Sequence, residues 1–142
     1  MRYLLDTDHI SFLQRRSSPE FLRLSSRMAQ HKISDFALSI VSFHEQVMGA
    51  HSFISRAQTS KDIARGYGLL FEIVRSFSDA PILLFDSSAI LIFNTMRSQK
   101  IRLATMDLRI ATIAISHNLI LLTRNISDFN QVPNLVVEDW TA

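Results

Sequence analysis

The feature that most constrains the fold is an alternation of short apolar segments with longer helical patterns. Each short segment is apolar at consecutive positions, which is typical of strands buried on both faces of a parallel sheet. Between them, apolar residues recur at helical spacing. We therefore predict an α/β fold, a three-layer α/β/α sandwich around a mainly parallel sheet of about five strands. The predicted strands are Tyr3–Leu5, Phe36–Val41, Ile82–Phe85, Leu119–Thr123 and Leu135–Glu138.

Local signals predict where several helices begin and end. Ser18 is expected to cap a helix that has Pro19 in its first turn, and Asp86 to cap the helix after the third strand. Asn118 is a candidate for the left-handed residue that ends a helix. Gly66 and Gly68 weaken one of the helical patterns. The predicted helices are His9–Arg15, Ser18–His31, Ser42–Gln58, Ser60–Phe77, Ser87–Gln99 and Thr105–His117, and a turn-rich segment runs from Asn125 to Asn134.

Composition limits the class of protein. The chain has 142 residues, 47% of them apolar, with three Gly and three Pro, which favours one domain over residues 1–142 without a linker. The absence of cysteine excludes disulfides, thiolate zinc sites and cysteine nucleophiles. No apolar segment is long enough to span a bilayer and no signal-peptide pattern is present, so we expect a cytoplasmic protein without a membrane partner. A net charge of +2 permits a nucleic-acid partner without indicating one.

Acidic and amide residues lie at the predicted carboxyl ends of the strands, where α/β sheets bind ligands. Asp6 follows the first strand and Glu45 lies early in the helix after the second. Asp107 opens the helix before the fourth strand, and Asn125 and Asp128 follow that strand. Carboxylates brought together repel one another and stay ionised only beside cations. With neither cysteine nor histidine at these positions, Mg²⁺ or Mn²⁺ is the expected ion.

Each acid also has a purely local explanation. Asp6 and Asp8 can cap the first helix, a common role for aspartate. The segment "SFHE", Ser42–Glu45, fits a capping box. Asp107 suits the positive end of its helix, and Asp128 can form an Asx turn. Each local explanation stays open for its own residue. Together they explain less well why all of these acids are expected at one edge of the sheet.

Three segments together resemble a known family. They are "LLDTDHIS" at Leu4–Ser11, "SIVSFHEQVMGA" at Ser39–Ala50, and "MDLRIATIAISHNLILLTRNISDFNQVPNLVVEDW" at Met106–Trp140. In this order they look like the successive motifs of PIN-domain ribonucleases, specifically the VapC-type toxins of bacterial toxin–antitoxin pairs. The last segment is the most specific, and the resemblance spans nearly the whole chain.

The resemblance implies a metal-dependent endoribonuclease that hydrolyses RNA phosphodiester bonds with Mg²⁺ or Mn²⁺. It implies Asp6 and Asp107 as direct metal ligands. Glu45 would be a ligand or would orient the attacking water. Asp128 or Asn125 would support a second ion.

Further residues of these motifs are candidates for supporting roles. Thr7, Asp8 and Ser11 are expected to orient the ligands through hydrogen bonds, with Asp8 and Thr7 nearest the first ligand in sequence. Arg109 and Arg124 are candidates for binding RNA phosphates, against the plainer interpretation that they lie on solvated helix faces.

The segment Ser42–Phe77 carries more apolar side chains than one face of a small sheet obviously requires. Core packing explains most of them. Relatives bind a cognate antitoxin along a hydrophobic groove of this region and pair as homodimers. The resemblance therefore implies a VapB-type antitoxin, with an arginine that reaches the acidic site, and a homodimer.

Two other classes remain as alternatives. A degenerate PIN-like domain would bind RNA or a partner without cutting. The strand ending in "DTD" also resembles the nucleophile loop of haloacid-dehalogenase-type phosphatases. Those enzymes need a later lysine and a downstream acidic pair. Lys32, Lys61 and Lys100 follow no predicted strand end, which disfavours the phosphatase.

Overall fold

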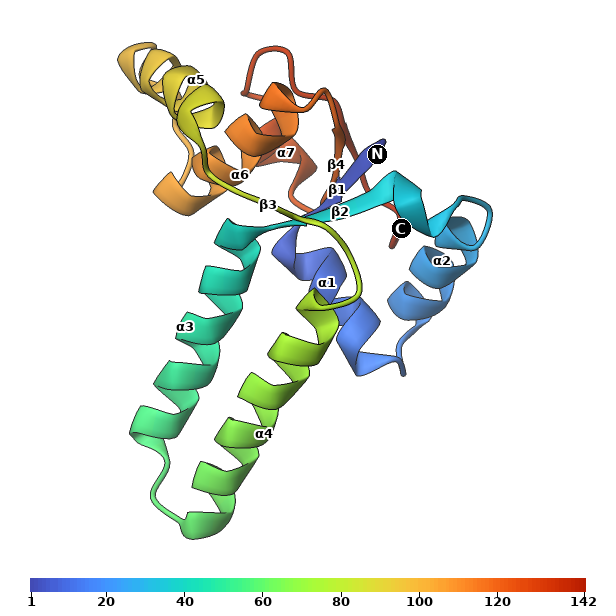
Figure 1. Cartoon of the computed structure of the whole chain (residues 1–142), viewed down its shortest axis with the longest axis vertical. Helices are drawn as coiled ribbons and strands as arrows, with labels where there is room; N and C mark the ends of the chain where they lie inside the picture. The colour runs from blue at the N-terminus through green and yellow to red at the C-terminus, as the bar shows by residue number, and fades with distance from the viewer.

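A five-stranded sheet with every strand pair parallel forms the centre of the molecule. The computed structural model describes all 142 residues, and its strand order is β3-β2-β1-β4-β5 (Figure 1). This confirms the predicted fold class. The strands are β1 (Tyr3–Leu5), β2 (Phe36–Ser39), β3 (Ile82–Leu83), β4 (Ile120–Leu122) and β5 (Val137–Glu138).

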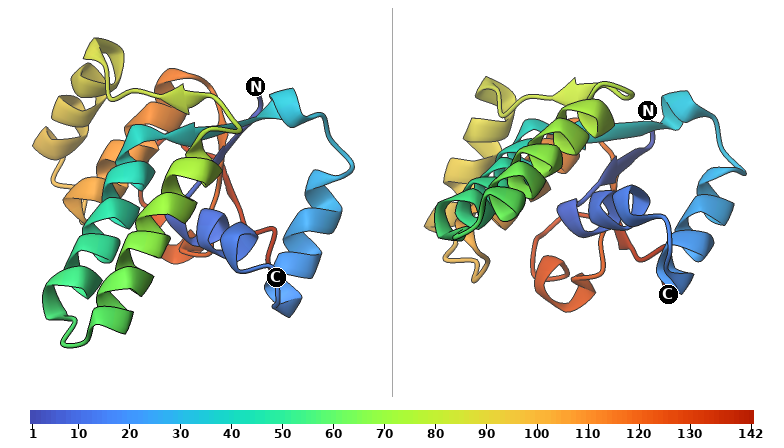
Figure 2. Two further views of the ribbon diagram at one scale, coloured as in Figure 1. Left: turned by 60° about the horizontal axis from the view of Figure 1, so that its bottom comes forward. Right: turned by 90° about the horizontal axis from the view of Figure 1, so that it is seen from below.

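Helices flank this sheet, and two of them form a long hairpin that projects away from it (Figures 1 and 2). The hairpin consists of α3 (Ile40–Arg56) and α4 (Ser60–Phe77). No helix is both long and apolar enough to cross a membrane. The other helices are α1 (Thr7–Arg15), α2 (Pro19–Met28), α5 (Ser87–Ser98), α6 (Thr105–Ser116) and the short α7 (Ile126–Phe129), with a 3₁₀ turn, η1, at Ile33–Asp35.

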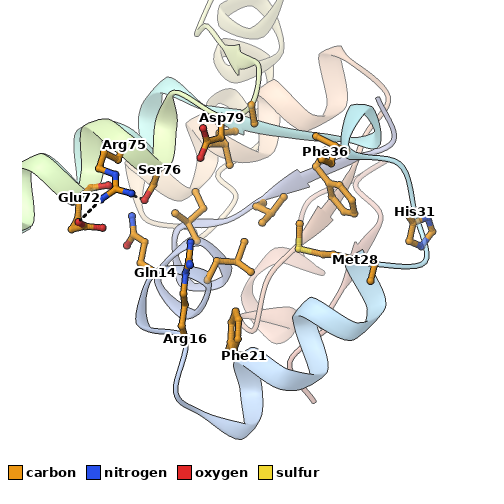
Figure 3. Close-up of a pocket in the computed structure, with 17 residues that line it drawn as sticks. Gln14, Arg16, Phe21, Met28, His31, Phe36, Glu72, Arg75, Ser76 and Asp79 are labelled. Carbon is orange, nitrogen blue, oxygen red and sulfur yellow. Dashed lines mark hydrogen bonds and ion pairs between the residues drawn. The ribbon is translucent and has the colours of Figure 1, made fainter.

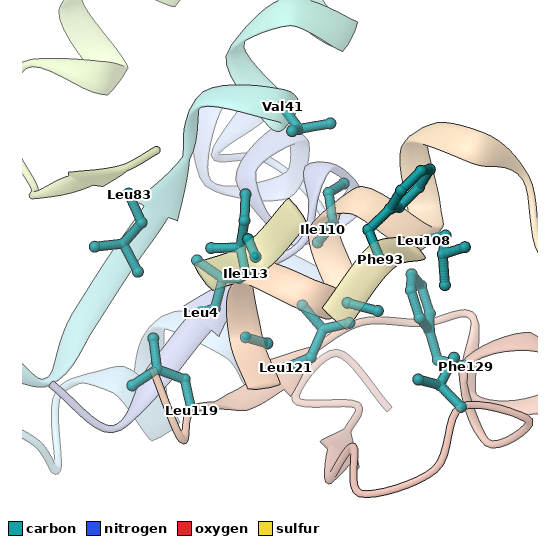
Figure 4. Packing of buried hydrophobic residues seen from close by; sticks show 14 of the residues in the cluster. Leu4, Val41, Leu83, Phe93, Leu108, Ile110, Ile113, Leu119, Leu121 and Phe129 are labelled. Carbon is teal, nitrogen blue, oxygen red and sulfur yellow. The ribbon is translucent and has the colours of Figure 1, made fainter. Parts of the chain in front are cut away.

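Alternate strand residues point to opposite faces of the sheet, so the core has two halves. Leu4, Ala37 and Leu121 belong to the half covered by α5 and α6, where Phe93 and Ile110 are buried (Figure 4). The other half is covered by α1, α2 and the α3–α4 hairpin. Its buried members are Tyr3, Leu5, Ile10, Leu24, Phe36, Leu38, Ala50, Ile73, Phe77, Leu122 and Trp140. The two halves explain why the strands are apolar at consecutive positions.

Helix α3 begins earlier than the sequence predicted. The Ser39 side chain caps it by accepting a hydrogen bond from the Ser42 backbone N–H, 3.0 Å away. The predicted strand Phe36–Val41 therefore ends at Ser39, and the predicted Ser42–Glu45 capping box is wrong. Because Ser42 is not the cap, Glu45 is free for a contact outside its own helix.

Other boundaries differ by a few residues or agree. Helix α1 begins at Thr7 rather than His9, and the turn-rich segment contains α7. Ser18 and Asp86 cap α2 and α5 as predicted. Asn118 takes a left-handed conformation, with φ of 55°, just after α6.

Candidate active site

Asp6 lies at the junction of β1 and α1, where parallel strands expose their carboxyl ends. It caps α1, since its Oδ1 accepts the Thr7 backbone N–H at 2.8 Å. Its Oδ2 accepts the Thr123 hydroxyl at 2.8 Å. The residue is only 6% exposed. Burial, with the negative charges of Asp8 and Asp107, raises the pKa of Asp6 to about 7 against these two hydrogen bonds.

Asp107 lies in the first turn of α6 and shares this acidic environment. Burial raises the pKa of its carboxyl group, and the negative charges of Glu45, Asp128 and Asp8 raise it further. Acids from four separate parts of the chain therefore act on one another at the carboxyl edge of the sheet.

Glu45 reaches this edge from the second turn of α3. Its Oε1 accepts the hydroxyl proton of Thr7 at 2.7 Å, and the Ser42 hydroxyl lies 3.0 Å from the same Thr7 oxygen. Thr7 therefore ties the start of α1 to the start of α3. The second carboxylate oxygen of Glu45 makes no hydrogen bond within the chain.

The four acids Asp6, Glu45, Asp107 and Asp128 lack positively charged partners. None of them forms an ion pair with lysine, arginine or histidine. As they lie, no three of the chain's acidic and histidine side chains form a ready cage for a metal ion. Their donors are nevertheless all oxygens, and their mutual repulsion is the condition that a hard divalent cation relieves. By charge and donor type the site fits Mg²⁺ or Mn²⁺.

The other residues predicted for the site fall into two groups. Thr7 and Asp8 lie within it, Asp8 accepting the Arg124 backbone N–H at 2.9 Å. Ser11 instead accepts a hydrogen bond from Gln46 and makes none to the acids. Asn125 contributes its backbone N–H, which donates to the Thr123 hydroxyl oxygen at 3.0 Å.

The two predicted phosphate-binding arginines lie apart. The Arg109 guanidinium is 6.0 Å from the centre of the Phe85 ring, beside a cavity of about 340 Å³ that His44 also lines. The Arg124 guanidinium is 5.3 Å from the Phe12 ring centre on α1.

Sequence reasoning missed two residues that contact the predicted ones. Thr123 donates directly to Asp6, and His9 contacts Asp8 through its Nδ1, 2.7 Å from Oδ1. Thr123 directly follows an apolar strand and lies level with Asp6, which follows the adjacent strand. This position was the signal by which Thr123 could have been found. For His9, the only signal was its position next to Asp8.

The chain aligns end to end with curated ribonucleases. It is 28% identical over 147 residues to Ribonuclease VapC1 of Haemophilus influenzae (strain R2866), with 99% of each chain covered. A shorter match is 50% identical over 34 residues to Ribonuclease VapC2 of Rickettsia felis, covering 24% of this chain and 25% of that protein. No protein-family model matches the chain.

Solved structures share the whole architecture. The DNA-bound VapBC of Salmonella typhimurium matches with a TM-score of 0.79 at 21% identity, covering 99% of this chain and 98% of the other. VapBC-1 of nontypeable Haemophilus influenzae matches with a TM-score of 0.77 at 24% identity over all of both chains. At these identities the likeness shows the fold.

The chain therefore shares the fold of the toxin–antitoxin structures that it matches, with a parallel sheet in the order β3-β2-β1-β4-β5. Over its full length the chain is similar to curated VapC ribonucleases, at 28% identity, which agrees with the resemblance carried by its sequence motifs.

Proposed function

We propose that this chain is an endoribonuclease toxin that hydrolyses RNA phosphodiester bonds at the acidic edge of its sheet. Its curated full-length relatives are named ribonucleases. The observation that carries the proposal is the group of four acids, Asp6, Glu45, Asp107 and Asp128, which has no cationic partner within the chain. The residues act as one domain over 1–142, in the cytoplasm, where cellular RNA is available.

Asp6 and Asp107 are the proposed ligands of Mg²⁺ or Mn²⁺. A bound ion of this kind neutralises charge on phosphate oxygens and lowers the pKa of a water molecule that it holds. The Thr7 hydroxyl fixes one oxygen of Glu45, which leaves the other to bind the ion or to accept a proton from water. Asp128 and Asn125 are the proposed support for a second ion.

Arg109 and Arg124 are the proposed contacts to RNA phosphates. Arg109 borders the 340 Å³ cavity, where Phe85 offers an aromatic ring and His44 a polar group. Guanidinium groups bind phosphate oxygens in bidentate geometry, which suits this role. RNA affinity that is unchanged in Arg109→Ala would count against the assignment.

A VapB-type antitoxin is the proposed regulatory partner. The solved structures that resemble this chain include VapBC complexes. A cavity of about 920 Å³ opens between α1, α2, β2 and the end of α4 (Figure 3). Phe21, Met28 and Phe36 line it, with Arg16 and Glu72 among its charged residues. We propose that an apolar antitoxin segment docks here, further toward α1 and α2 than the sequence indicated.

None of the four acids lines this cavity, so an antitoxin arginine that neutralises them would come from a segment that extends beyond the cavity. We also propose that the chain pairs as a homodimer. Sedimentation as a monomer at micromolar concentration would contradict the dimer.

Cleavage of total RNA by the purified chain tests the function. With Mn²⁺, we expect the wild type to cut and Asp107→Asn to lose at least about a hundredfold in rate, because a neutral amide is a poor ligand for a hard cation. EDTA should abolish cutting by the wild type. Asp86→Asn is the matched control, since Asp86 only caps α5 and asparagine caps equally well.

Equal cleavage by Asp107→Asn and the wild type would remove the acid from the mechanism. A wild type that binds Mn²⁺ in calorimetry without cutting RNA would support the degenerate PIN-like domain instead.

A further inference from the structure

His9 is a completely buried histidine that the proposed chemistry leaves without a role. It lies in the first turn of α1, and both ring nitrogens have partners. Nε2 accepts the backbone N–H of Trp140 at 3.2 Å. Because Nε2 accepts, the proton of the neutral ring is on Nδ1, which donates to Asp8 Oδ1 at 2.7 Å.

The second oxygen of Asp8 holds the chain just after β4. Asp8 Oδ2 accepts the Arg124 backbone N–H at 2.9 Å. The adjacent Thr123 accepts the Asn125 N–H at 3.0 Å and donates its hydroxyl to Asp6 at 2.8 Å. A series of hydrogen bonds therefore runs from His9 through Asp8 and the segment Thr123–Arg124 to Asp6. Thr123 lies 115 positions from Asp8 and 117 from Asp6 in the sequence.

The C-terminal segment that contacts His9 is itself packed against the rest of the chain. The Trp140 ring is 1% exposed, 4.7 Å from the Tyr3 ring centre, and lies under the Arg27 guanidinium at 4.5 Å. The nearby Asp139 carboxylate is 3.8 Å from Nε2 and already accepts two hydrogen bonds from Thr141. The backbone of Trp140, rather than Asp139, is thus the hydrogen-bond partner of Nε2.

We propose that His9 is a positioning residue for the acidic site. The backbone N–H of Trp140 holds the His9 ring, and the ring in turn holds the Asp8 carboxylate. Asp8 then holds the backbone at Thr123 and Arg124, so that the Thr123 hydroxyl points to Asp6. Hydrogen bonds behind metal ligands set ligand orientation in the same way in known sites. The inference rests on the proposed function only in taking Asp6 as the cation ligand.

Two conservative variants separate the two ends of the ring. In His9→Asn, the side-chain NH₂ replaces Nδ1–H toward Asp8 and the acceptor for Trp140 is lost. In His9→Gln, the side-chain carbonyl replaces Nε2 as acceptor and the donor to Asp8 is lost. If His9 is a positioning residue, the acidic site depends on the hydrogen bond from His9 to Asp8. His9→Asn keeps this bond and should retain the Arg124 N–H protection and the Mn²⁺ affinity that His9→Gln loses. His51→Gln, at an exposed position, is the matched control.

The first readout needs no metal. It is the hydrogen-exchange rate of the Arg124 backbone N–H, measured by NMR. The rate should rise about tenfold in His9→Gln, since its acceptor Asp8 becomes mobile, and stay near the wild-type value in His9→Asn. Unchanged exchange in His9→Gln, or an equal rise in both variants, would overturn the proposal.

The second readout is Mn²⁺ affinity by calorimetry. His9→Gln should bind about 10- to 100-fold more weakly than wild type, and His9→Asn within about threefold. Equal affinity in wild type and His9→Gln would overturn the link to the ligand. If the wild type itself binds no Mn²⁺, the proposed function fails, whereas the exchange readout still decides on His9.

Thr123→Val keeps the side-chain shape and removes only the last hydroxyl of the series. It should weaken Mn²⁺ binding as much as His9→Gln does, and the double variant should lose no more than Thr123→Val alone. Additive losses would mean that His9 acts by another route. If the His9 variants do not fold, Thr123→Val carries the test, and unchanged Mn²⁺ affinity in it overturns the proposal.

Discussion

The side chain of Asp6 is nearly buried beside other acids, an arrangement that costs free energy in the metal-free protein. The residue was predictable from sequence because an acid directly after a buried strand is a strong local signal. Thr123 and His9 were not, since their roles depend on hydrogen bonds to residues more than a hundred positions away. Sequence therefore predicted the acids better than the groups that hold them.

The raised pKa of Asp6 predicts a pH dependence of stability. A carboxyl group whose pKa is about 7 when folded and 3.8 when unfolded favours folding below pH 4, and this contribution is lost as the pH rises toward 7. Asp107 acts in the same direction. We expect the free energy of unfolding in EDTA to fall by roughly 2–4 kcal/mol between pH 4 and pH 8.

Urea unfolding at several pH values measures this slope. Asp6→Asn should flatten most of it, whereas Asp86→Asn should keep it. A slope that persists unchanged in Asp6→Asn would show that Asp6 does not carry the linked proton.

At the scale of elements, the strands and helices were predicted well where the signal was local. The bounds predicted for helix α4, Ser60–Phe77, are those of the structure, where the Thr59 side chain caps the helix by accepting the Asp62 backbone N–H. Helix α3 was misjudged at its start, since Ser39 and Ser42 are both good caps and only the sheet register decides between them. Gly66 and Gly68 were both expected to weaken helix α4, but we expect their replacement by alanine to change the stability of the protein in opposite directions.

Gly66 faces the partner helix, where an added Cβ would collide with the Ile54 side chain, whereas nothing lies near a Cβ at Gly68. We expect Gly66→Ala to destabilise the protein by about 1–3 kcal/mol through overpacking. Gly68→Ala should stabilise it by up to about 1 kcal/mol through helix propensity. Urea unfolding of the two variants checks the pair, and equal effects would refute close packing at Gly66.

At the scale of the whole molecule, the sheet brings together segments from the start, the middle and the end of the chain. Parallel topology made the meeting of Asp6, Glu45 and Asp107 predictable, because all three follow or precede strands at one edge. The return of Trp140 to pack on Tyr3 was not predictable, since no local pattern encodes that contact. The same return brings the Trp140 backbone N–H to His9 Nε2, the contact on which the proposed positioning role of His9 rests.

Anomalous scattering from crystals soaked in Mn²⁺ tests most directly whether the acidic edge binds a cation. We expect a manganese peak within coordinating distance of Asp6 and Asp107 in the wild type and none at that position in Asp107→Asn. A wild-type crystal whose acids stay free of manganese, or bind it only elsewhere on the surface, would contradict the proposed site.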